Sequence, residues 1–506
     1  MRTRYQLTLL TLVLVASVVA AVVLYGRDRH AFLFYGDAAS HIVKGRELVD
    51  SRYPGISSIG SVWLPLPHIL LVPFVVFDVL FFSGIAGAAL GIPCLLATAA
   101  LLFSIVRRLT GSAPVSFISA CLFALNPNVV YISLTPMSEP CLYFFIALGG
   151  YALLRWSVQE EARWLVLCSA SVMLATMCRY EAWPLALFVS VLAAVKGMVS
   201  WKESRNAEAT KMVGIALLAI AGIILWLWWN AYKFGDALQF APWKYRAPPS
   251  DIRNPMSYRQ EAVSFTLLRA VLNIFGPVAL LVCGAGMVWL KRFLIHRRDI
   301  LLTIYLSIPS LFIFVGILRD YVLIDQWWWN WRFVLIFGLF VSVVGGIGLS
   351  ELFRRFQSKL VRGTVLVGLL AMPVTQLTVS SVSVAAYEDA SKIFGGLSKY
   401  AAALGERLPQ LTKKGSIELF TGSGLGERIM VSSGIPLRNF RLVVSPGGLD
   451  LQGPLRNGDR YVVIGKVRLP DSRQTVDYWL SRREEFLRLY TILFEDEHYI
   501  LLEKKT

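Results

Sequence analysis

Long apolar runs constrain the fold of this chain more than any other feature of its sequence. A helix needs about 20 mostly apolar residues to cross the ~30 Å hydrocarbon core of a bilayer. Eleven runs in the 506 residues qualify as candidate spans, at 6–25, 84–106, 114–134, 140–154, 164–178, 183–197, 213–230, 265–290, 300–318, 333–350 and 362–382. The sequence therefore predicts an all-α polytopic membrane protein with about 11 transmembrane helices. The first run follows Arg2 and Arg4, and the ten later spans favour a signal anchor over a cleaved signal peptide.

One more apolar stretch, residues 63–77, decides the topology. Three prolines break it, it stops at Asp78, and at about 15 residues it is short for a span. If it lies flat on the outer face, the cytoplasmic loops hold 18 Lys and Arg against 6 Asp and Glu, and the outer loops hold 14 against 12. Because cytoplasmic loops carry the excess of Lys and Arg, we expect the N-terminus inside and the segment 63–77 on the membrane surface.

The net charge of +17 would by itself suggest nucleic-acid binding. Its distribution argues against nucleic acid, because most of the excess lies in the predicted cytoplasmic loops, where it orients helices and meets anionic lipid. With 56% hydrophobic and 16% charged residues, an ordinary soluble enzyme and a disordered chain are also excluded.

Three predicted outer stretches are large enough for chemistry: 26–83, 230–264 and the tail 384–506. The tail lacks long apolar runs and alternates strand and helix patterns. Strands are expected at 417–420, 441–444, 461–464 and 490–494, and helices at 392–407 and 476–489. We therefore expect a membrane domain over 1–382 and a small extracytoplasmic α/β domain over 384–506.

Ionisable residues gather at the predicted outer ends of several helices. Such residues are costly at membrane depth and are therefore candidates for function. They are Asp37 after the first span, Glu139 at the outer end of the third, Arg179 and Glu181 between the fifth and sixth, and Arg332 at the start of the tenth. All lie at one face beside bends or tight loops, so we expect one pocket of carboxylates and guanidiniums.

This combination of residues indicates a class of reaction. A carboxylate can take the proton of an acceptor hydroxyl, and arginine binds phosphate through two parallel hydrogen bonds. Apolar grooves between helices hold lipid. Together these groups suit a lipid-linked phospho-sugar whose sugar is passed to a hydroxyl outside the membrane. No cofactor is evident: His and Cys lack metal-ligand spacing, although two or three carboxylates could hold a divalent ion.

Five short motifs, in this order, resemble the GT-C glycosyltransferases. They are the Asp soon after the first span, Trp63-Leu-Pro-Leu-Pro-His68, Pro136-Met-Ser-Glu139-Pro140, Arg179-Tyr-Glu-Ala-Trp183 and the late Trp-Arg332-Phe. The stretch Asn230-Ala-Tyr-Lys-Phe-Gly235-Asp236 adds to the likeness. More narrowly, residues 1–382 are similar to bacterial relatives of dolichyl-phosphate-mannose-protein mannosyltransferases and of aminoarabinose transferase.

The resemblance implies an inverting transfer of a sugar from a polyprenyl-phosphate donor at the outer face. The family's first-loop acid maps to Asp37 and its late phosphate-binding arginine maps to Arg332. Family members often carry an Asp-Glu pair in the first loop, but here Ala38 follows Asp37. The second acid is then supplied elsewhere, with Glu139 as the candidate, or is absent. Arg179 is a second candidate for the donor phosphate.

Each candidate has a structural alternative. Asp37 could cap a helix, Glu139 could sit in a first helical turn, and Arg179 could form a structural pair with Glu181. Arg332 could stack among the tryptophans at 327–331 in an interfacial belt. Weaker candidates for contacting substrate, each with packing or lipid headgroups as its alternative, are Glu181, Tyr180, His41, Trp63, His68 and Lys244.

The favoured interpretation is a membrane glycosyltransferase of a prokaryotic inner membrane, with a protein, lipid or glycan as acceptor. A transporter or flippase of lipid-linked sugars is the alternative. Such proteins often show repeated halves and broken helices at mid-membrane, whereas this sequence shows no repeat and its charges gather at one face. A scaffold that only presents the tail would not need ionisable residues at helix ends.

Overall fold

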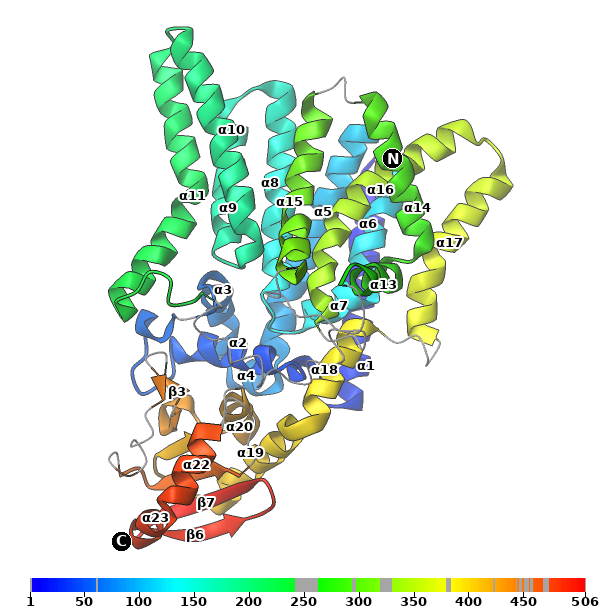
Figure 1. The fold of residues 1–506 in the computed structure, drawn as a ribbon. Coiled ribbons are helices and arrows are strands. Elements are labelled where there is room, and N and C mark those ends of the chain that lie inside the picture. Colours follow the sequence, from blue (N-terminus) through cyan, green and yellow to red (C-terminus); the bar gives the residue numbers. More distant parts are fainter. Residues whose placement is uncertain are drawn as a thin grey trace.

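The computed structural model describes most of the chain. The described residues are 2–60, 62–241, 263–293, 297–318, 330–378, 384–421, 424–442, 444–445, 448–449, 455, 458–466 and 473–505. Figure 1 shows a helical bundle with the N-terminus at one end, and the sheet of the tail beyond the other end.

Eight described helices are long and apolar enough to cross a membrane. The helices that form these candidate spans are α1 (Arg2–Arg27), α5 (Ile85–Thr110), α8 (Glu139–Gln159), α10 (Trp183–Lys202), α11 (Asn206–Phe234), α15 (Arg297–Leu318), α16 (Phe337–Arg355) and α17 (Lys359–Thr378). Two bent pairs raise the number to ten among the described residues. The predicted run 164–178 forms α9 (Ala162–Thr176), whose 15 residues are shorter than a usual span. The polytopic helical fold is confirmed, while the count of eleven remains a prediction.

Two runs predicted as continuous spans are broken. Helices α6 (Ala113–Ala124) and α7 (Pro127–Leu134) meet at 57°, and α13 (Val263–Phe275) and α14 (Pro277–Phe293) meet at 104°. Each second helix starts with a proline, which has no N–H for the preceding turn. The free backbone finds other partners: the Asn126 side chain accepts from the Asn128 N–H at 3.0 Å and donates to the Ile274 carbonyl at 2.7 Å.

The stretch 26–83, predicted to lie on the outer side, folds into short helices at the end of the bundle nearest the sheet (Figure 1). They are η1 (Ala31–Leu33), α2 (Gly36–Glu47), η2 (Ile56–Ser58), α3 (Leu66–Val75) and α4 (Asp78–Ser83). The predicted surface segment 63–77 contains α3, which at 10 residues extends only ~15 Å. The helix is therefore shorter than a bilayer span needs, and its place on the membrane surface remains a prediction.

The tail builds a five-stranded sheet in the order β2-β1-β5-β7-β6. Its strands are β1 (Ile417–Phe420), β2 (Phe440–Leu442), β5 (Tyr461–Gly465), β6 (Tyr490–Glu495) and β7 (Tyr499–Lys504), with β3 (Val444–Ser445) and β4 (Gly448–Leu449) as a separate pair. Strand β1 is parallel to β2 and β5, whereas β7 is antiparallel to β5 and β6. The predicted α/β character is confirmed, but β7 was not predicted.

The helices of the tail join the sheet to the bundle. They are α18 (Ala385–Ile393), η7 (Phe394–Ser398), α19 (Lys399–Leu411), α20 (Leu425–Ser433), η8 (Leu437–Asn439), α22 (Arg473–Ser481) and α23 (Arg483–Leu489). One hydrophobic core unites the tail with the helices of the stretch 26–83, and it includes Ile42, Leu71, Phe81, Leu404, Ile417 and Ile429. The tail therefore packs directly on the segment that carries Asp37.

Candidate active site

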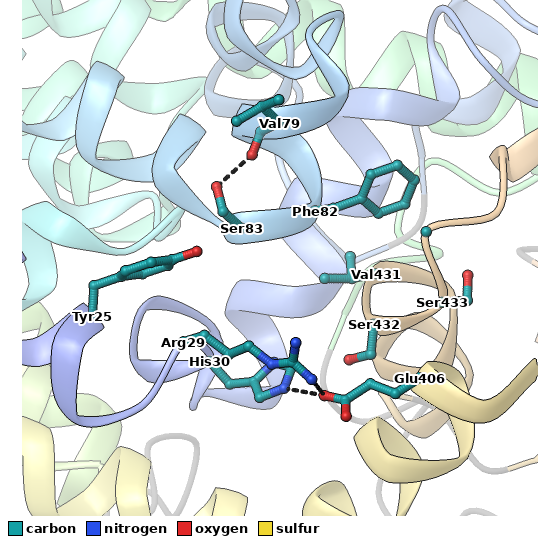
Figure 2. Close-up of a pocket in the computed structure, with 11 residues that line it drawn as sticks. Tyr25, Arg29, His30, Val79, Phe82, Ser83, Glu406, Val431, Ser432 and Ser433 are labelled. Atoms are coloured by element: carbon teal, nitrogen blue, oxygen red, sulfur yellow. Dashed lines mark hydrogen bonds and ion pairs between the residues drawn. The ribbon is translucent and has the colours of Figure 1, made fainter. Parts of the chain in front are cut away.

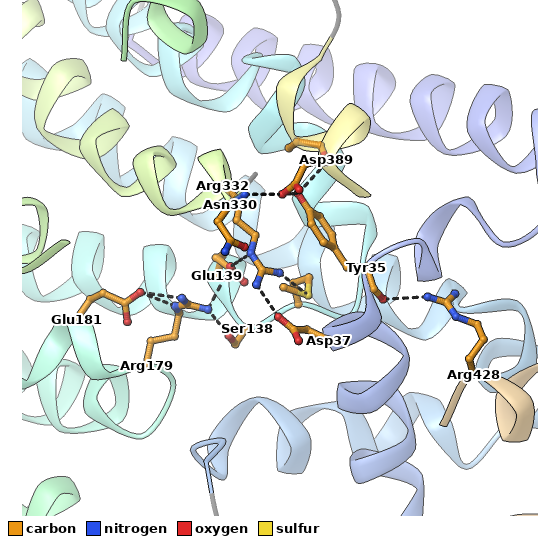
Figure 3. Close-up of polar contacts among 12 residues, drawn as sticks. Tyr35, Asp37, Ser138, Glu139, Arg179, Glu181, Asn330, Arg332, Asp389 and Arg428 are labelled. Carbon is orange, nitrogen blue, oxygen red and sulfur yellow. Dashed lines mark hydrogen bonds and ion pairs between the residues drawn. The ribbon is translucent and has the colours of Figure 1, made fainter. Parts of the chain in front are cut away.

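Residues from four separate parts of the chain meet at the bundle end that faces the tail (Figure 3). Asp37 lies in the first turn of α2, and Glu139 is the first residue of α8. A helix N-terminus carries a partial positive charge, which stabilises a carboxylate there. Arg179 precedes the 3-10 helix η3 (Tyr180–Ala182), and Arg332 lies in the 3-10 helix η6 (Trp331–Ile336).

Arg332 connects the two predicted catalytic acids. Its Nη2 donates to Asp37 Oδ2 at 2.5 Å, and its Nε lies 3.9 Å from Glu139 Oε1. The guanidinium also stacks over the Tyr35 ring at 4.7 Å. Arg332 is buried, while the Asp37 side chain is 44% exposed. Asp37 thus reaches outward from a buried cation, a position from which it can also contact a substrate.

The environment of Asp37 works in two directions on its acidity. Desolvation by the surrounding protein raises the pKa of this carboxyl group, but the charge and hydrogen bond of Arg332, together with smaller contributions from His41 and Arg179, lower it by more. The net pKa lies below the ordinary value, so Asp37 is ionised at neutral pH. Tyr35 and not Asp37 occupies the N-cap of α2, so the capping alternative does not describe this residue.

Arg179 forms a second bridge beside the first. Its Nη1 lies 3.1 Å from Glu139 Oε1 and donates to Ser138 Oγ at 3.1 Å, and its Nη2 lies 2.8 Å from Glu181 Oε1. The predicted structural pair with Glu181 is therefore present, but Arg179 also contacts Glu139. The five predicted charged residues form one connected network.

Glu139 is the most buried of these acids, at 2% exposure. Neither oxygen of its carboxylate accepts a hydrogen bond from any described residue, so the contacts with Arg179 and Arg332 are electrostatic. The network contains three carboxylates and two guanidiniums, which leaves one negative charge in excess among these described side chains. Carboxylate oxygens that receive no hydrogen bond from the described residues can accept one from a hydroxyl group at this site.

His41 and His68 form a pair one helical turn beyond Asp37. His41 Nδ1 lies 2.7 Å from His68 Nε2, so one ring donates to the other. Burial lowers the pKa of His41 to about 4, and that of His68 also falls, so both rings are neutral at neutral pH. Trp63 lies against His41, with 4.8 Å between ring centroids.

The described contacts of one weaker candidate, Tyr180, lie outside the network. The Tyr180 hydroxyl donates to the Val62 carbonyl at 2.7 Å, and its ring stacks on Phe240 at 5.1 Å. Tyr180 therefore packs in a small aromatic cluster, as its structural alternative predicted. Lys244 lies outside the described residues, as do Trp327, Trp328 and Trp329.

Comparison with known proteins found one matching family model and similar solved structures. The family model for dolichyl-phosphate-mannose-protein mannosyltransferases matches residues 77–205. Two crystal structures of ArnT from Cupriavidus metallidurans are similar over 97% of both chains. The apo structure has 12% identity and a TM-score of 0.55, and the structure bound to undecaprenyl phosphate has 14% and 0.53. No curated protein matches the sequence.

The chain has the fold of ArnT. The predicted resemblance is thereby confirmed, although the family model covers only 129 of the 506 residues.

Sequence reasoning missed four polar residues of this site. Ser138 lies within the Pro136-Met-Ser-Glu139-Pro140 motif and Tyr35 precedes Asp37 by two residues, so the signal that could have found them is their place beside Glu139 and Asp37. Asn330 precedes Arg332 by two residues and has a left-handed backbone with φ of 59°. Asp389 lies in the tail, about 350 residues from Tyr35, and no pattern in the sequence connects them.

A cavity of about 550 Å³ lies elsewhere in the protein (Figure 2). It is bounded by the end of α1, by α4 and by the tail, and its lining includes Tyr25, Arg29, His30, Phe82 and Glu406. None of the predicted site residues lines it. Within the described part of the chain, no group of three or more His, Cys, Asp or Glu could hold a metal ion.

Proposed function

We propose that this protein transfers a sugar from a polyprenyl-phosphate carrier to an acceptor hydroxyl at the outer face of a membrane, with inversion at the anomeric carbon. The observation that carries the proposal is the convergence of Asp37 and Glu139 on Arg332, with Arg179 beside them. The printed description of the matching family model and the carrier bound in one ArnT structure support the donor class.

Donor binding would exchange the partner of Arg332. In the structure its guanidinium is paired with Asp37, so the proposed phosphate-binding group and the proposed base are bound to each other. A phosphate oxygen offers the same charge and acceptor geometry as the Asp37 carboxylate. When the donor phosphate takes this place, Asp37 loses its cation, and its pKa rises toward the value a general base needs.

The transfer step then follows from these positions. The acceptor oxygen attacks the anomeric carbon while its proton passes to Asp37, and the carbon–oxygen bond to the carrier phosphate breaks. The departing phosphate takes the bonding electron pair, and Arg332 stabilises its charge, with Arg179 as a second cation. Glu139 keeps the two guanidiniums in place and offers its unused oxygens to a hydroxyl of the substrate.

The proposed site of action is the outer leaflet of a prokaryotic inner membrane, with the N-terminus inside. The charge distribution supports this orientation, and the N-terminus and the sheet lie at opposite ends of the bundle (Figure 1). On this proposal residues 1–382 form the catalytic membrane domain and 384–506 an extracytoplasmic domain. A protein, lipid or glycan hydroxyl accepts the sugar.

The deciding experiment incubates membranes that contain the protein with polyprenyl-phosphate sugars labelled in the sugar. The proposal expects label on a new, carrier-free product, in an amount that depends on the protein. Label that changes leaflet while it stays on its carrier would instead support a flippase. Matched membranes with the Asp37→Asn variant serve as the control for background transfer.

A further inference from the structure

A buried carboxylate of the tail connects the two segments that carry Asp37 and Arg332. Asp389 in α18 is 2% exposed. Its Oδ2 accepts a hydrogen bond from the Tyr35 hydroxyl at 3.0 Å and another from the Asn330 backbone N–H, also at 3.0 Å. A single oxygen of the tail therefore holds two segments that are almost 300 residues apart in sequence (Figure 3).

The two donors lie at the same sequence distance from the two proposed site residues. Tyr35 precedes Asp37 by two residues, and Asn330 precedes Arg332 by two residues. Tyr35 is 1% exposed, and its ring lies under the Arg332 guanidinium at 4.7 Å. Moving either donor would therefore shift the geometry of the Asp37–Arg332 pair.

A second residue of the tail, Arg428, binds the backbone of the segment that contains Tyr35. Arg428 in α20 is fully buried, and its Nη2 donates to the carbonyls of Phe34 and Tyr35, each at 3.2 Å. The single proton of the Tyr35 hydroxyl is shared between Asp389 Oδ2 and the Ala386 carbonyl, which lies 2.8 Å from the hydroxyl oxygen. The backbone leading into α2 is thus fixed between α18 and α20, and both helices belong to the tail.

We propose that Asp389 is a positioning residue for the transfer reaction, acting through Tyr35 and Asn330 to set the distance between Asp37 and Arg332. This inference rests on the proposed function. It also gives the tail a role in catalysis: the segment after the last membrane helix completes the site instead of only adjoining it. Its effect is on geometry, since a misplacement of about 1 Å can cost roughly 100-fold in rate.

The test compares three variants of the purified full-length protein with wild type. Asp389→Ala removes the shared acceptor oxygen, and Asp389→Asn keeps an oxygen that can take both hydrogen bonds. Glu388→Gln changes the neighbouring acid of the same helix and is the matched control. We expect Asp389→Ala to lower kcat about 10- to 100-fold and to raise the KM for the donor. We expect Asp389→Asn to recover most of the loss, and Glu388→Gln to behave as wild type.

A double-variant cycle tests the contact without measuring transfer. Tyr35→Phe removes one of the two donors, so its effect on the thermal unfolding midpoint should be smaller in the Asp389→Ala background than in wild type. Equal effects in both backgrounds would overturn the contact. An active wild type with an equally active Asp389→Ala, or an Asp389→Asn as impaired as Asp389→Ala, would overturn the positioning role. An inactive wild type with a coupled cycle would overturn the proposed function alone.

Discussion

The Arg332 guanidinium donates to the Asp37 carboxylate at 2.5 Å, although the two residues are 295 positions apart in the chain. In the structure the proposed phosphate-binding group and the proposed base are thus each other's partners. On the proposed function, binding of the donor would separate them. This exchange ties donor binding to the release of the base, and it makes the two residues testable by different measurements.

Replacing Asp37 with Asn should abolish transfer while leaving expression and donor binding intact. Loss of a positioned general base costs about 10²–10⁴ in rate. Because the neutral amide competes less well for Arg332, the variant should bind the polyprenyl-phosphate carrier at least as tightly as wild type. Turnover and direct carrier binding are both measured. A fully active Asp37→Asn would remove the basis of the mechanism, and the partly exposed Glu161→Gln is the control.

Replacing Arg332 with Lys should act mainly on the donor. Lysine keeps the charge but lacks the planar fork that matches a phosphate, so the KM for the donor should rise about tenfold. Steady-state kinetics over a range of donor concentrations measure the change. The matched control is Arg163→Lys, whose side chain is 69% exposed. An unchanged donor KM with a lower kcat would assign Arg332 to another step.

Replacing Glu139 with Gln tests the buried acid. The amide has nearly the same shape but no charge, so Arg179 retains only Glu181 as an anionic partner within the network. We expect the free energy of unfolding to fall by roughly 1–3 kcal/mol, since a buried charged contact is lost. Transfer should fall as well. Unfolding in detergent and turnover are measured on the same preparation, and wild-type values for both would contradict a role for Glu139.

The histidine pair predicts a pH dependence of stability. The pKa of His41 is about 4 in the folded protein, below the ordinary value near 6.5. Between these values the unfolded chain binds more protons, so stability falls as pH drops from about 7 to 4. The contribution of His41 is at most roughly 3 kcal/mol. Unfolding midpoints across this range should show a smaller pH slope for His41→Asn, and an unchanged slope would contradict the assignment.

Local patterns explain why much of the fold could be predicted. Apolar runs of membrane length mark helices because each residue of a span meets lipid or another helix. Every one of the eleven runs contains described helix, and the four predicted strands overlap β1, β2, β5 and β6. The breaks at Asn126 and Gly276 were not predicted, because only the partners of the freed backbone groups decide whether a proline bends or ends a span.

The charged residues of the candidate site could be predicted from the sequence, but the contacts between them could not. Charged side chains at the membrane face stand out, because their burial is costly unless they are paired or functional. That argument selected Asp37, Glu139, Arg179, Glu181 and Arg332, all of which the structure joins into one network. The same argument passed over Asp389, which looks like any acid of a polar tail. Tyr180, a weaker candidate that carries no charge, packs elsewhere.

The sequence by itself determined that this chain is a polytopic helical protein with an α/β tail, because hydropathy, periodicity and charge are properties of neighbouring residues. Only the tertiary structure decided which charge meets which. Two sets of contacts depend on how distant helices pack: the ion pair of Asp37 with Arg332, and the hydrogen bonds that Asp389 accepts from Tyr35 and Asn330. A contact across 300 residues leaves no local pattern, since it is formed by the fold and not by spacing along the chain.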